Sequence, residues 1–198
     1  MRCGSIGRLD RKPAVVGHSF GGLIAQKIAG EGAAVVTVAI DPAPGRGVLP
    51  LPPSALKAGS PVLGNPANAR RSVTLTFDEF KYGWANGLDE EEARQLYDEF
   101  HVAASGVPIF QAAVANLNPF SETKVNFKAA NRGPILLISG EKDQTVQHAM
   151  TYAAYRRHTK NSGVTEFVEL PGRGHSLVID NGWEQVARTA LDFVHKYA

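Results

Sequence analysis

Ser19 stands in a segment whose residue types and spacing suit a nucleophile. The run Gly17-His18-Ser19-Phe20-Gly21-Gly22 follows the apolar stretch Pro13–Val16 and precedes the helix-like stretch Leu23–Ala29. This order predicts a strand, a sharp turn and a helix, with the serine at the apex of the turn. We expect the glycines two residues before and after the serine to be required, because a side chain there would collide with the neighbouring strand or helix. The first N–H groups of the helix would then lie beside the hydroxyl.

Two later segments supply candidates for a base and an acid. A serine hydroxyl becomes a good nucleophile only when a base takes its proton and a carboxylate orients that base. Asp143 lies in Ser139-Gly140-Glu141-Lys142-Asp143-Gln144-Thr145-Val146, and His175 lies in Pro171-Gly172-Arg173-Gly174-His175-Ser176. Each directly follows a predicted strand, so we expect both side chains to meet Ser19 at one edge of a parallel sheet. This arrangement predicts acyl chemistry through a covalent intermediate.

The elements that must position these residues alternate between strands and helices. Four apolar segments are predicted to be strands: Pro13–Val16, Ala33–Ile40, Ile135–Ser139 and Val164–Leu170. The expected helices of this part of the chain are Leu23–Ala29, Gln147–His158 and Asn181–Tyr197, the last with the capping-box spacing of Asn181 and Glu184. Alternation of this kind predicts an α/β fold with a parallel sheet.

Residues 42–133 differ in character from the segments on either side. They open with five prolines that should exclude regular structure: Pro42, Pro44, Pro50, Pro52 and Pro53. They then become mostly helical, with a cap at Asp89 and Glu92 and a further helix over Pro108–Leu117. Because the carboxyl ends of parallel strands are where ligands bind, we predict that 42–133 form a cap over a core of residues 1–41 and 134–198.

The composition excludes several other classes of protein. The 198 residues suit a single domain, and the net charge of +2 argues against nucleic acid or a polybasic membrane anchor as a partner. Cys3 is the only cysteine, which excludes an internal disulfide and a cysteine-rich metal site. Residues 1–12 contain no apolar stretch of the kind found in signal peptides, and no run approaches the length of a membrane span. We therefore expect a soluble, cytoplasmic protein.

The three motif segments resemble those of serine esterases of the α/β-hydrolase family. The similarity extends from Pro13 to the end of the chain and includes the nucleophile, acid and histidine segments quoted above. It implies a role for each of four residues: Ser19 as nucleophile, His175 as general base and then acid, Asp143 as orienting carboxylate, and the Phe20 backbone N–H as one oxyanion-hole donor. It implies no cofactor and no metal.

Several assignments keep an alternative. Asp41 directly follows the second strand, where some family members carry the acid, and Asp143 could instead cap the helix near Val146. We favour Asp143 because its glycine–acid–hydrophobe segment fits better. His18 is expected to be a pocket or packing residue beside the nucleophile. Aromatic residues of the insertion could line an acyl pocket or form the cap's own core: Phe77, Phe80, Tyr82, Trp84, Phe110 and Phe120.

The sequence departs from the family before the serine strand. Family members ordinarily carry more strands there, together with a loop that supplies a second oxyanion donor. We expect a truncated sheet of about four strands, whose exposed apolar edge could pair with a second copy of the chain. The chain would then be a fragment of a longer protein, a short form completed by another chain, or a degenerate hydrolase.

The predicted function is that of a serine hydrolase that cleaves small carboxylic esters. Perhydrolase, thioesterase and other acyl-transfer activities use the same three residues, so they stay open. A catalytically impaired binding or interaction module is the alternative of another class. Substrate identity and acyl chain length depend on the geometry of the cap, which one sequence does not determine.

Overall fold

A parallel sheet lies at the centre of the molecule, for which a computed structural model describes residues 6–198 and leaves Cys3 outside. Its strands are β1 (Ala14–His18), β2 (Val36–Ile40), β5 (Ile135–Gly140) and β6 (Thr165–Leu170), paired in the order β1-β2-β5-β6. These strands overlap the four predicted segments, and their ends differ from the predicted ends by at most three residues. The α/β fold with a parallel sheet is therefore confirmed.

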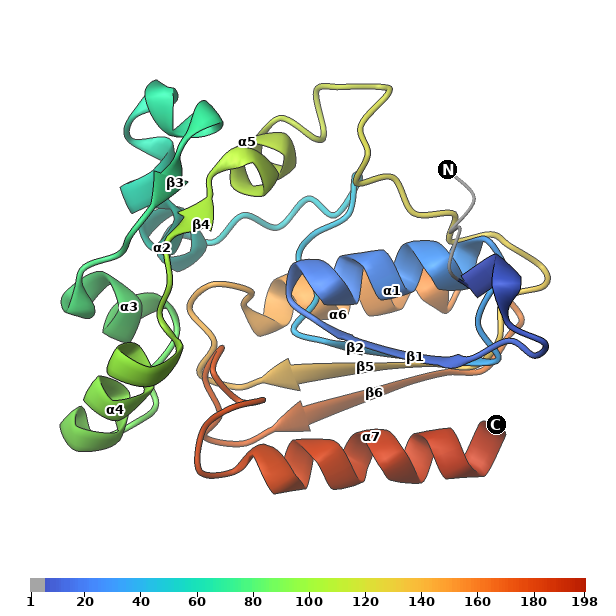
Figure 1. Cartoon of the computed structure of the whole chain (residues 1–198). Helices are drawn as coiled ribbons and strands as arrows, with labels where there is room; N and C mark the ends of the chain where they lie inside the picture. Colours follow the sequence, from blue (N-terminus) through green and yellow to red (C-terminus); the bar gives the residue numbers. More distant parts are fainter. Residues whose placement is uncertain (1–5) are drawn as a thin grey trace.

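Helices cover both faces of this sheet (Figure 1). On one face lie α1 (Phe20–Gly30) and α6 (His148–His158), and on the other lies α7 (Trp183–Tyr197). Alternate side chains of β5 point to opposite faces of the sheet. Ile135 and Leu137 pack on the face covered by α1 and α6, whereas Leu136 and Ile138 pack on the face covered by α7. Burial on both faces explains why β2 and β5 are apolar almost without interruption.

The start of α7 differs from the prediction. The helix begins at Trp183, and Asn181 does not cap it, because the backbone N–H and the Nδ2 group of Asn181 donate to the Glu92 carboxylate at 2.7 Å each. Trp183, the first residue of the helix, has about half of its surface exposed (51%). A tertiary contact with the insertion therefore replaces the local capping box.

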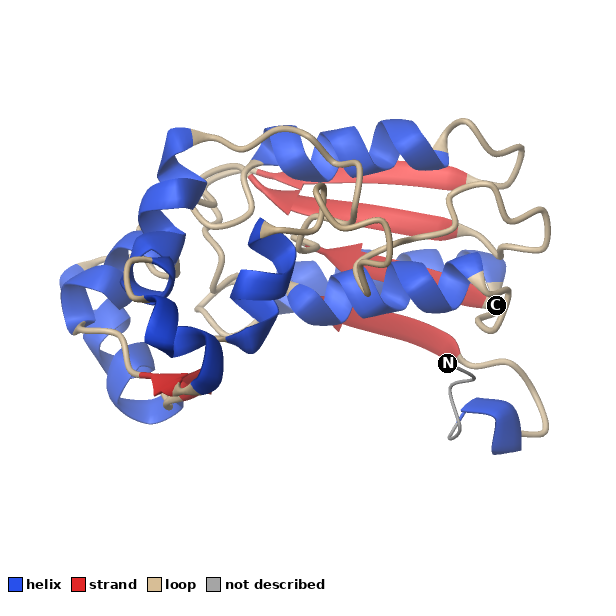
Figure 2. Cartoon of the chain, turned by 90° about the horizontal axis from the view of Figure 1, so that it is seen from above, coloured by secondary structure: helices blue, strands red, loops and turns tan. Residues whose placement is uncertain are grey.

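The helical part of the segment between β2 and β5 lies beyond the carboxyl ends of the strands, and the loop after it returns along α1 to the start of β5 (Figures 1 and 2). Its helices are α2 (Pro53–Leu63), the 3₁₀ turn Pro66–Arg70, α3 (Phe77–Gly83), α4 (Glu90–Phe100) and α5 (Val107–Ala113). A two-stranded antiparallel ladder joins β3 (Ser72–Val73) to β4 (Ala104–Ser105). This placement agrees with a cap over the sheet edge, and the division of the chain into core and cap stays a prediction.

The insertion meets the sequence predictions unevenly. The Asp89 side chain caps α4 as expected, accepting from the Glu92 N–H at 2.8 Å. Pro53 was expected outside regular structure but begins α2, since proline is tolerated in the first turn of a helix. The helix α5 ends at Ala113 instead of Leu117, and the β3–β4 ladder was not predicted. Within residues 6–198 no helix has both the length and the apolar character of a membrane span.

Candidate active site

The Ser19 turn holds its serine in a backbone conformation that few residues other than glycine adopt. Ser19 has φ 54° and ψ −120°, and α1 begins at the next residue. Its N–H donates to the Ile40 carbonyl at 3.0 Å, and its own carbonyl accepts from Leu23 at 3.1 Å. A Cβ added at Gly17 would lie 2.2 Å from the Gly21 carbonyl oxygen, so a glycine is required there. The expectation for Gly21 is wrong, because a Cβ there would meet nothing within 4 Å.

The side chains of Ser19, Asp143 and His175 form a chain of hydrogen bonds. Nε2 of His175 lies 3.0 Å from Oγ of Ser19, and Nδ1 of His175 lies 2.6 Å from Oδ2 of Asp143. Asp143 and His175 are almost fully buried (2% and 0% exposed). The residues follow β1, β5 and β6, whose carboxyl ends lie at one edge of the parallel sheet, with β2 between β1 and β5. The structure therefore brings together the three residues that the motifs singled out.

Asp143 also accepts hydrogen bonds from the backbone of its own loop. Its Oδ1 accepts from the N–H groups of Thr145 at 2.7 Å and Val146 at 2.8 Å, just before α6 begins. The helix α6 begins at His148, and its N-cap is Gln147 without a side-chain capping hydrogen bond, so the alternative that Asp143 caps this helix is wrong. The Oδ1 contacts instead order the loop before the helix. Burial by itself would raise the pKa of Asp143, but the charge and hydrogen bond of His175, with the two N–H groups, lower it. The carboxyl group is therefore held in its charged form.

Asp41, the rival acid, is in a different electrostatic state. It follows β2 with φ 35°, is fully buried, and accepts from the Gly140 N–H at 2.9 Å through Oδ1. Its Oδ2 has no hydrogen-bond partner among the described residues. Burial and the nearby charge of Asp143 raise the pKa of Asp41 well above its usual value. A carboxyl group with a raised pKa is less able to stabilise an imidazolium by its negative charge, so the electrostatics favour Asp143 as the partner of His175.

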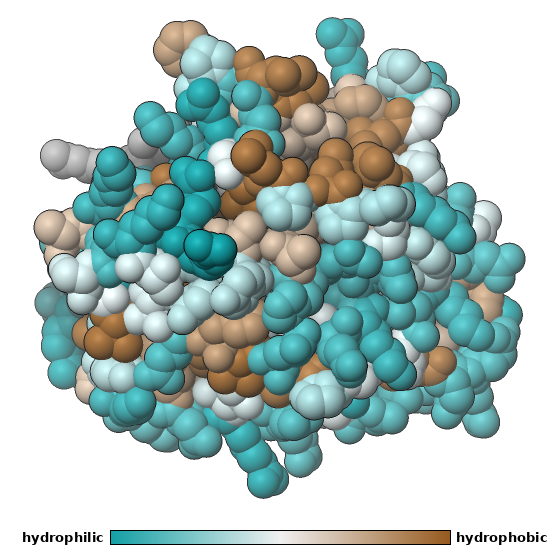
Figure 3. Space-filling model, turned by 180° about the vertical axis from the view of Figure 1, so that it is seen from behind, coloured by the Kyte–Doolittle hydropathy of each residue, from teal (hydrophilic) through white to brown (hydrophobic). Residues whose placement is uncertain are grey.

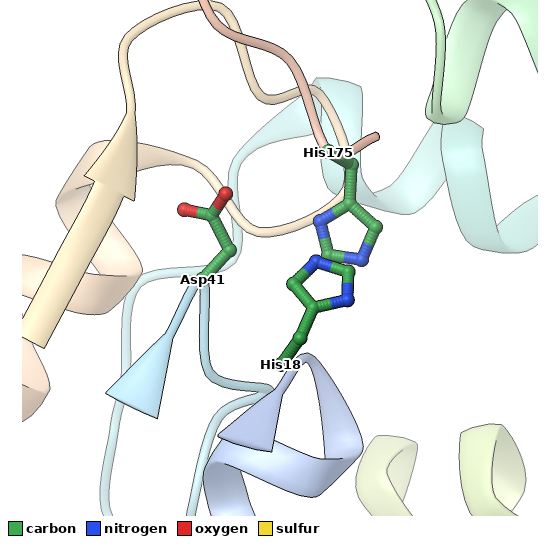
Figure 4. Close-up of side chains that lie close together, drawn as sticks. All are labelled: His18, Asp41 and His175. Atoms are coloured by element: carbon green, nitrogen blue, oxygen red, sulfur yellow. The ribbon is translucent and has the colours of Figure 1, made fainter. Parts of the chain in front are cut away.

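His18 packs against His175 in the same cluster (Figure 4). The two ring centroids are 4.6 Å apart, and burial, with the charge of His175, lowers the pKa of His18 to about 3. His18 is therefore neutral, which agrees with the predicted packing role and excludes it as a cation near neutral pH.

The cluster of Figure 4 also has the residue types of a metal site. Ligand atoms of His18, Asp41 and His175 lie within 4.8 Å of one another. Both ring nitrogens of His175 already have hydrogen-bond partners, so an ion bound there would replace one of them. The side chains fit the hydrogen-bond chain better than a metal, and the absence of a metal stays a prediction.

The insertion contacts the loops that carry Asp143 and His175. The Trp84 ring lies edge-on to His175 with centroids 4.8 Å apart, and the Trp84 carbonyl accepts from the Ser176 N–H at 3.0 Å. Asn86 Nδ2 donates to the Lys142 carbonyl at 2.7 Å, and Thr145 Oγ1 donates to the Gly83 carbonyl at 2.7 Å. The segment 83–86 therefore fixes the geometry of both loops from above the sheet edge.

Sequence reasoning found these contacts only in part. Trp84 was one of six aromatic residues with two possible roles, and Asn86 was missed. No local signal could reveal them, because the hydrogen bonds join positions 56 and 62 residues apart. Phe80, by contrast, lies in the insertion's own core, and Phe120 is 88% exposed, so neither aromatic residue is a pocket wall.

Comparison with known proteins agrees with this fold. The model of the alpha/beta hydrolase family matches residues 4–189. Among solved structures, a monoacylglycerol lipase from Paleococcus ferrophilus is 22% identical with a TM-score of 0.60, over 98% of this chain and 72% of that one. A thermophilic esterase from Thermogutta terrifontis is 20% identical with a TM-score of 0.63, over 98% and 68%. Rv0554 from Mycobacterium tuberculosis is 17% identical with a TM-score of 0.65, over 98% and 69%.

The family match spans most of the chain, and the likeness to the solved structures supports the same fold. A search of curated proteins finds no match. The chain belongs to the α/β-hydrolase family.

Proposed function

We propose that the protein is a serine hydrolase that cleaves small carboxylic esters through an acyl-enzyme. The observation that carries the proposal is the hydrogen-bond chain from Ser19 Oγ through both ring nitrogens of His175 to Asp143, at 3.0 and 2.6 Å. The positive φ of Ser19 supports it, because a strained serine at a strand–helix turn has few structural reasons to exist. The esterase and lipase names of the neighbours agree with the proposal and add no substrate to it.

Each step assigns one proton to one atom. Ser19 Oγ attacks the ester carbonyl carbon while His175 Nε2 takes the hydroxyl proton, and Asp143 holds the imidazolium at Nδ1. The Phe20 N–H, at the first position of α1, is proposed to donate to the oxyanion, because the first N–H groups of a helix have no acceptor inside it. The imidazolium then protonates the departing alcohol. Water then attacks the acyl carbon while His175 Nε2 takes its proton. The bond from Ser19 Oγ to the acyl carbon breaks, the imidazolium returns the proton to Oγ, and the acid is released.

Covalent labelling tests the proposal more directly than turnover. We expect a fluorophosphonate probe to form an adduct that peptide mass spectrometry maps to Ser19, because only an activated serine reacts with it. Ser19→Ala should abolish both the adduct and hydrolysis of p-nitrophenyl butyrate. Ser162→Ala, at an exposed bend, is the matched control and should retain both.

Two outcomes would count against the esterase. An adduct that survives Ser19→Ala would place the reactive group elsewhere. A folded protein that forms no adduct would favour the alternative, a binding module with an inactive triad. Labelling of Ser19 without ester turnover would keep the nucleophile and direct attention to thioesters or to other acyl acceptors.

A further inference from the structure

A cationic pocket lies at the end of α6 opposite the Asp143 loop. It encloses about 520 Å³ between the segment 124–128 and the C-terminal end of α6. Seven residues line it, and four of them carry positive charge: Lys124, Lys128, Arg157 and Lys160. None of the seven is acidic. The mechanism proposed above uses none of these residues.

In the wall formed by residues 124–128, exposed and buried side chains alternate along the chain. Val125 and Phe127 are buried (6% and 7% exposed), whereas Lys124 and Lys128 are exposed on the same segment. Asn126 anchors this segment by donating from Nδ2 to the Gly30 carbonyl at 3.3 Å. The two lysine positions are therefore held in the folded chain, although their side chains are free to move.

The opposite wall holds an arginine in a defined orientation. Arg157 Nη1 donates to the Gly47 carbonyl at 2.9 Å, and the guanidinium lies over the Phe127 ring with 4.5 Å to the centroid. Its Nε is buried without a partner among the described residues. Asn161 Nδ2 donates to the Ala129 carbonyl at 2.7 Å and joins the two walls beside Lys160. The pocket is therefore bounded by elements that contact each other directly.

The four charges have no counterions within the described part of the chain. Ion pairs form elsewhere between residues 6 and 198, but none includes Lys124, Lys128, Arg157 or Lys160. Figure 3 views the face on the α6 side, where strongly hydrophilic residues gather beside an apolar area. Like charges brought together repel one another, and an anion that binds among them relieves that repulsion. We propose that this pocket binds the phosphate or diphosphate group of a ligand, since lysine and arginine are the side chains that recognise such groups.

Isothermal titration calorimetry of the full chain with inorganic pyrophosphate tests the pocket. We expect saturable binding to a single site that weakens as salt is added. Lys128→Glu/Lys160→Glu should lower the affinity by about tenfold or more, because two attractive contacts become repulsive. Lys128→Gln/Lys160→Gln, which introduces no repulsion, gives a second variant if the first does not fold.

Arg70→Glu/Arg71→Glu provides a control with the same change in net charge. Both arginines are exposed, lie in or next to the 3₁₀ turn of the insertion, and do not line the pocket. Pyrophosphate affinity should be within about twofold of the unsubstituted protein. No binding by the unsubstituted protein, unchanged binding by the pocket variants, or an equal loss in the control would overturn the proposal.

A second measurement identifies the source of the phosphate group. We would sediment the protein with vesicles of phosphatidylcholine that contain phosphatidic acid. Pyrophosphate binding without vesicle binding assigns the pocket to a soluble ligand. If both pyrophosphate and the pocket variants abolish vesicle binding, the pocket is assigned to a lipid headgroup. If the variants leave vesicle binding intact, the result contradicts a role of this pocket in lipid binding.

Discussion

Two buried carboxyl groups at neighbouring strand ends, Asp41 and Asp143, have pKa values shifted in opposite directions. Asp143 has a lowered pKa because His175 and two backbone N–H groups outweigh its burial. Asp41 has a raised pKa because burial and the charge of Asp143 act together, and only one N–H opposes them. The difference between the two comes from the number of donors facing each carboxyl group and not from depth, since both are buried.

Substitution of each aspartate by asparagine should separate these two states. Asp143→Asn is expected to lower kcat by about 10⁴-fold, because the amide cannot stabilise the imidazolium and favours the wrong tautomer. Asp41→Asn should retain activity, because asparagine resembles the neutral carboxyl group and can still accept from Gly140. Ester hydrolysis by the purified variants measures both. Equal losses in the two variants would mean that Asp41 takes part in the reaction.

Asp41→Asn also has a predicted effect on stability. A carboxyl group whose folded pKa is raised stabilises the fold below its unfolded pKa of 3.8, and this stabilisation is lost as the pH rises. The free energy of unfolding at pH 7 should therefore increase in Asp41→Asn. Urea denaturation at pH 7 and at pH 3.5 checks this, with the gain expected only at the higher pH.

His158 makes stability depend on pH in the opposite sense. It is buried between Phe127 and Gln26, and burial, with the charges of Arg132 and Arg157, lowers its pKa from 6.5 to about 3. The unfolded chain binds a proton near pH 6.5, which the folded chain does not, so stability is present above 6.5 and is lost as the pH falls. Between pH 8 and pH 5 this one histidine should lower the free energy of unfolding by about 2 kcal/mol.

His158→Gln measures that contribution. Glutamine does not titrate and can keep the contact with Gln26, so the pH dependence should become flatter by about 2 kcal/mol between pH 8 and pH 5. His195→Gln, on the exposed side of α7, is the control and should leave the slope unchanged. A variant slope equal to that of the unsubstituted protein would show that His158 is not buried in its neutral form.

At the scale of elements, the two glycines of the turn between β1 and α1 have similar places in the motif but differ in the space available for a side chain. A Cβ at Gly17 meets the Gly21 carbonyl at 2.2 Å, whereas a Cβ at Gly21 meets nothing within 4 Å. Gly17→Ala should lower the free energy of unfolding by about 3 kcal/mol and prevent labelling of Ser19. Gly21→Ala should be neutral or stabilising by up to about 1 kcal/mol, because alanine favours a helix. Thermal denaturation of the two variants compares them.

The same contrast shows how far sequence reasoning reaches. Local patterns predicted the four strands, the helices of the core and the meeting of Ser19, Asp143 and His175, because apolar periodicity and motif order are local properties. The local patterns gave wrong or incomplete predictions where a residue's contacts depend on a partner far away in the sequence. Asn181 has the spacing of a capping box but binds Glu92, and Trp84 contacts His175 across the insertion. The electrostatic states of Asp41 and Asp143 likewise depend on packing that no single segment contains.

At the scale of the whole molecule, β1 is one of the two edge strands of the four-stranded sheet within residues 6–198. It pairs with β2 on one side, and Val16 is 54% exposed. An edge strand with one free side can pair with a second copy of the chain, and self-association through this edge stays a prediction. Sedimentation velocity should show a species that grows with protein concentration, and Val16→Lys should remove it, because lysine on an edge opposes strand pairing. A concentration-independent monomer would contradict the prediction.

The contact of residues 83–86 with the Asp143 and His175 loops has a consequence for how the molecule opens. The Ser176 N–H donates to a carbonyl of the insertion, and so does the Thr145 hydroxyl. Amide hydrogen exchange at Ser176 should therefore follow the opening of the insertion and not the slower opening of the sheet, as expected for one cooperative unit. Local unfolding of the insertion would then release the His175 loop while β2 and β5 stay protected.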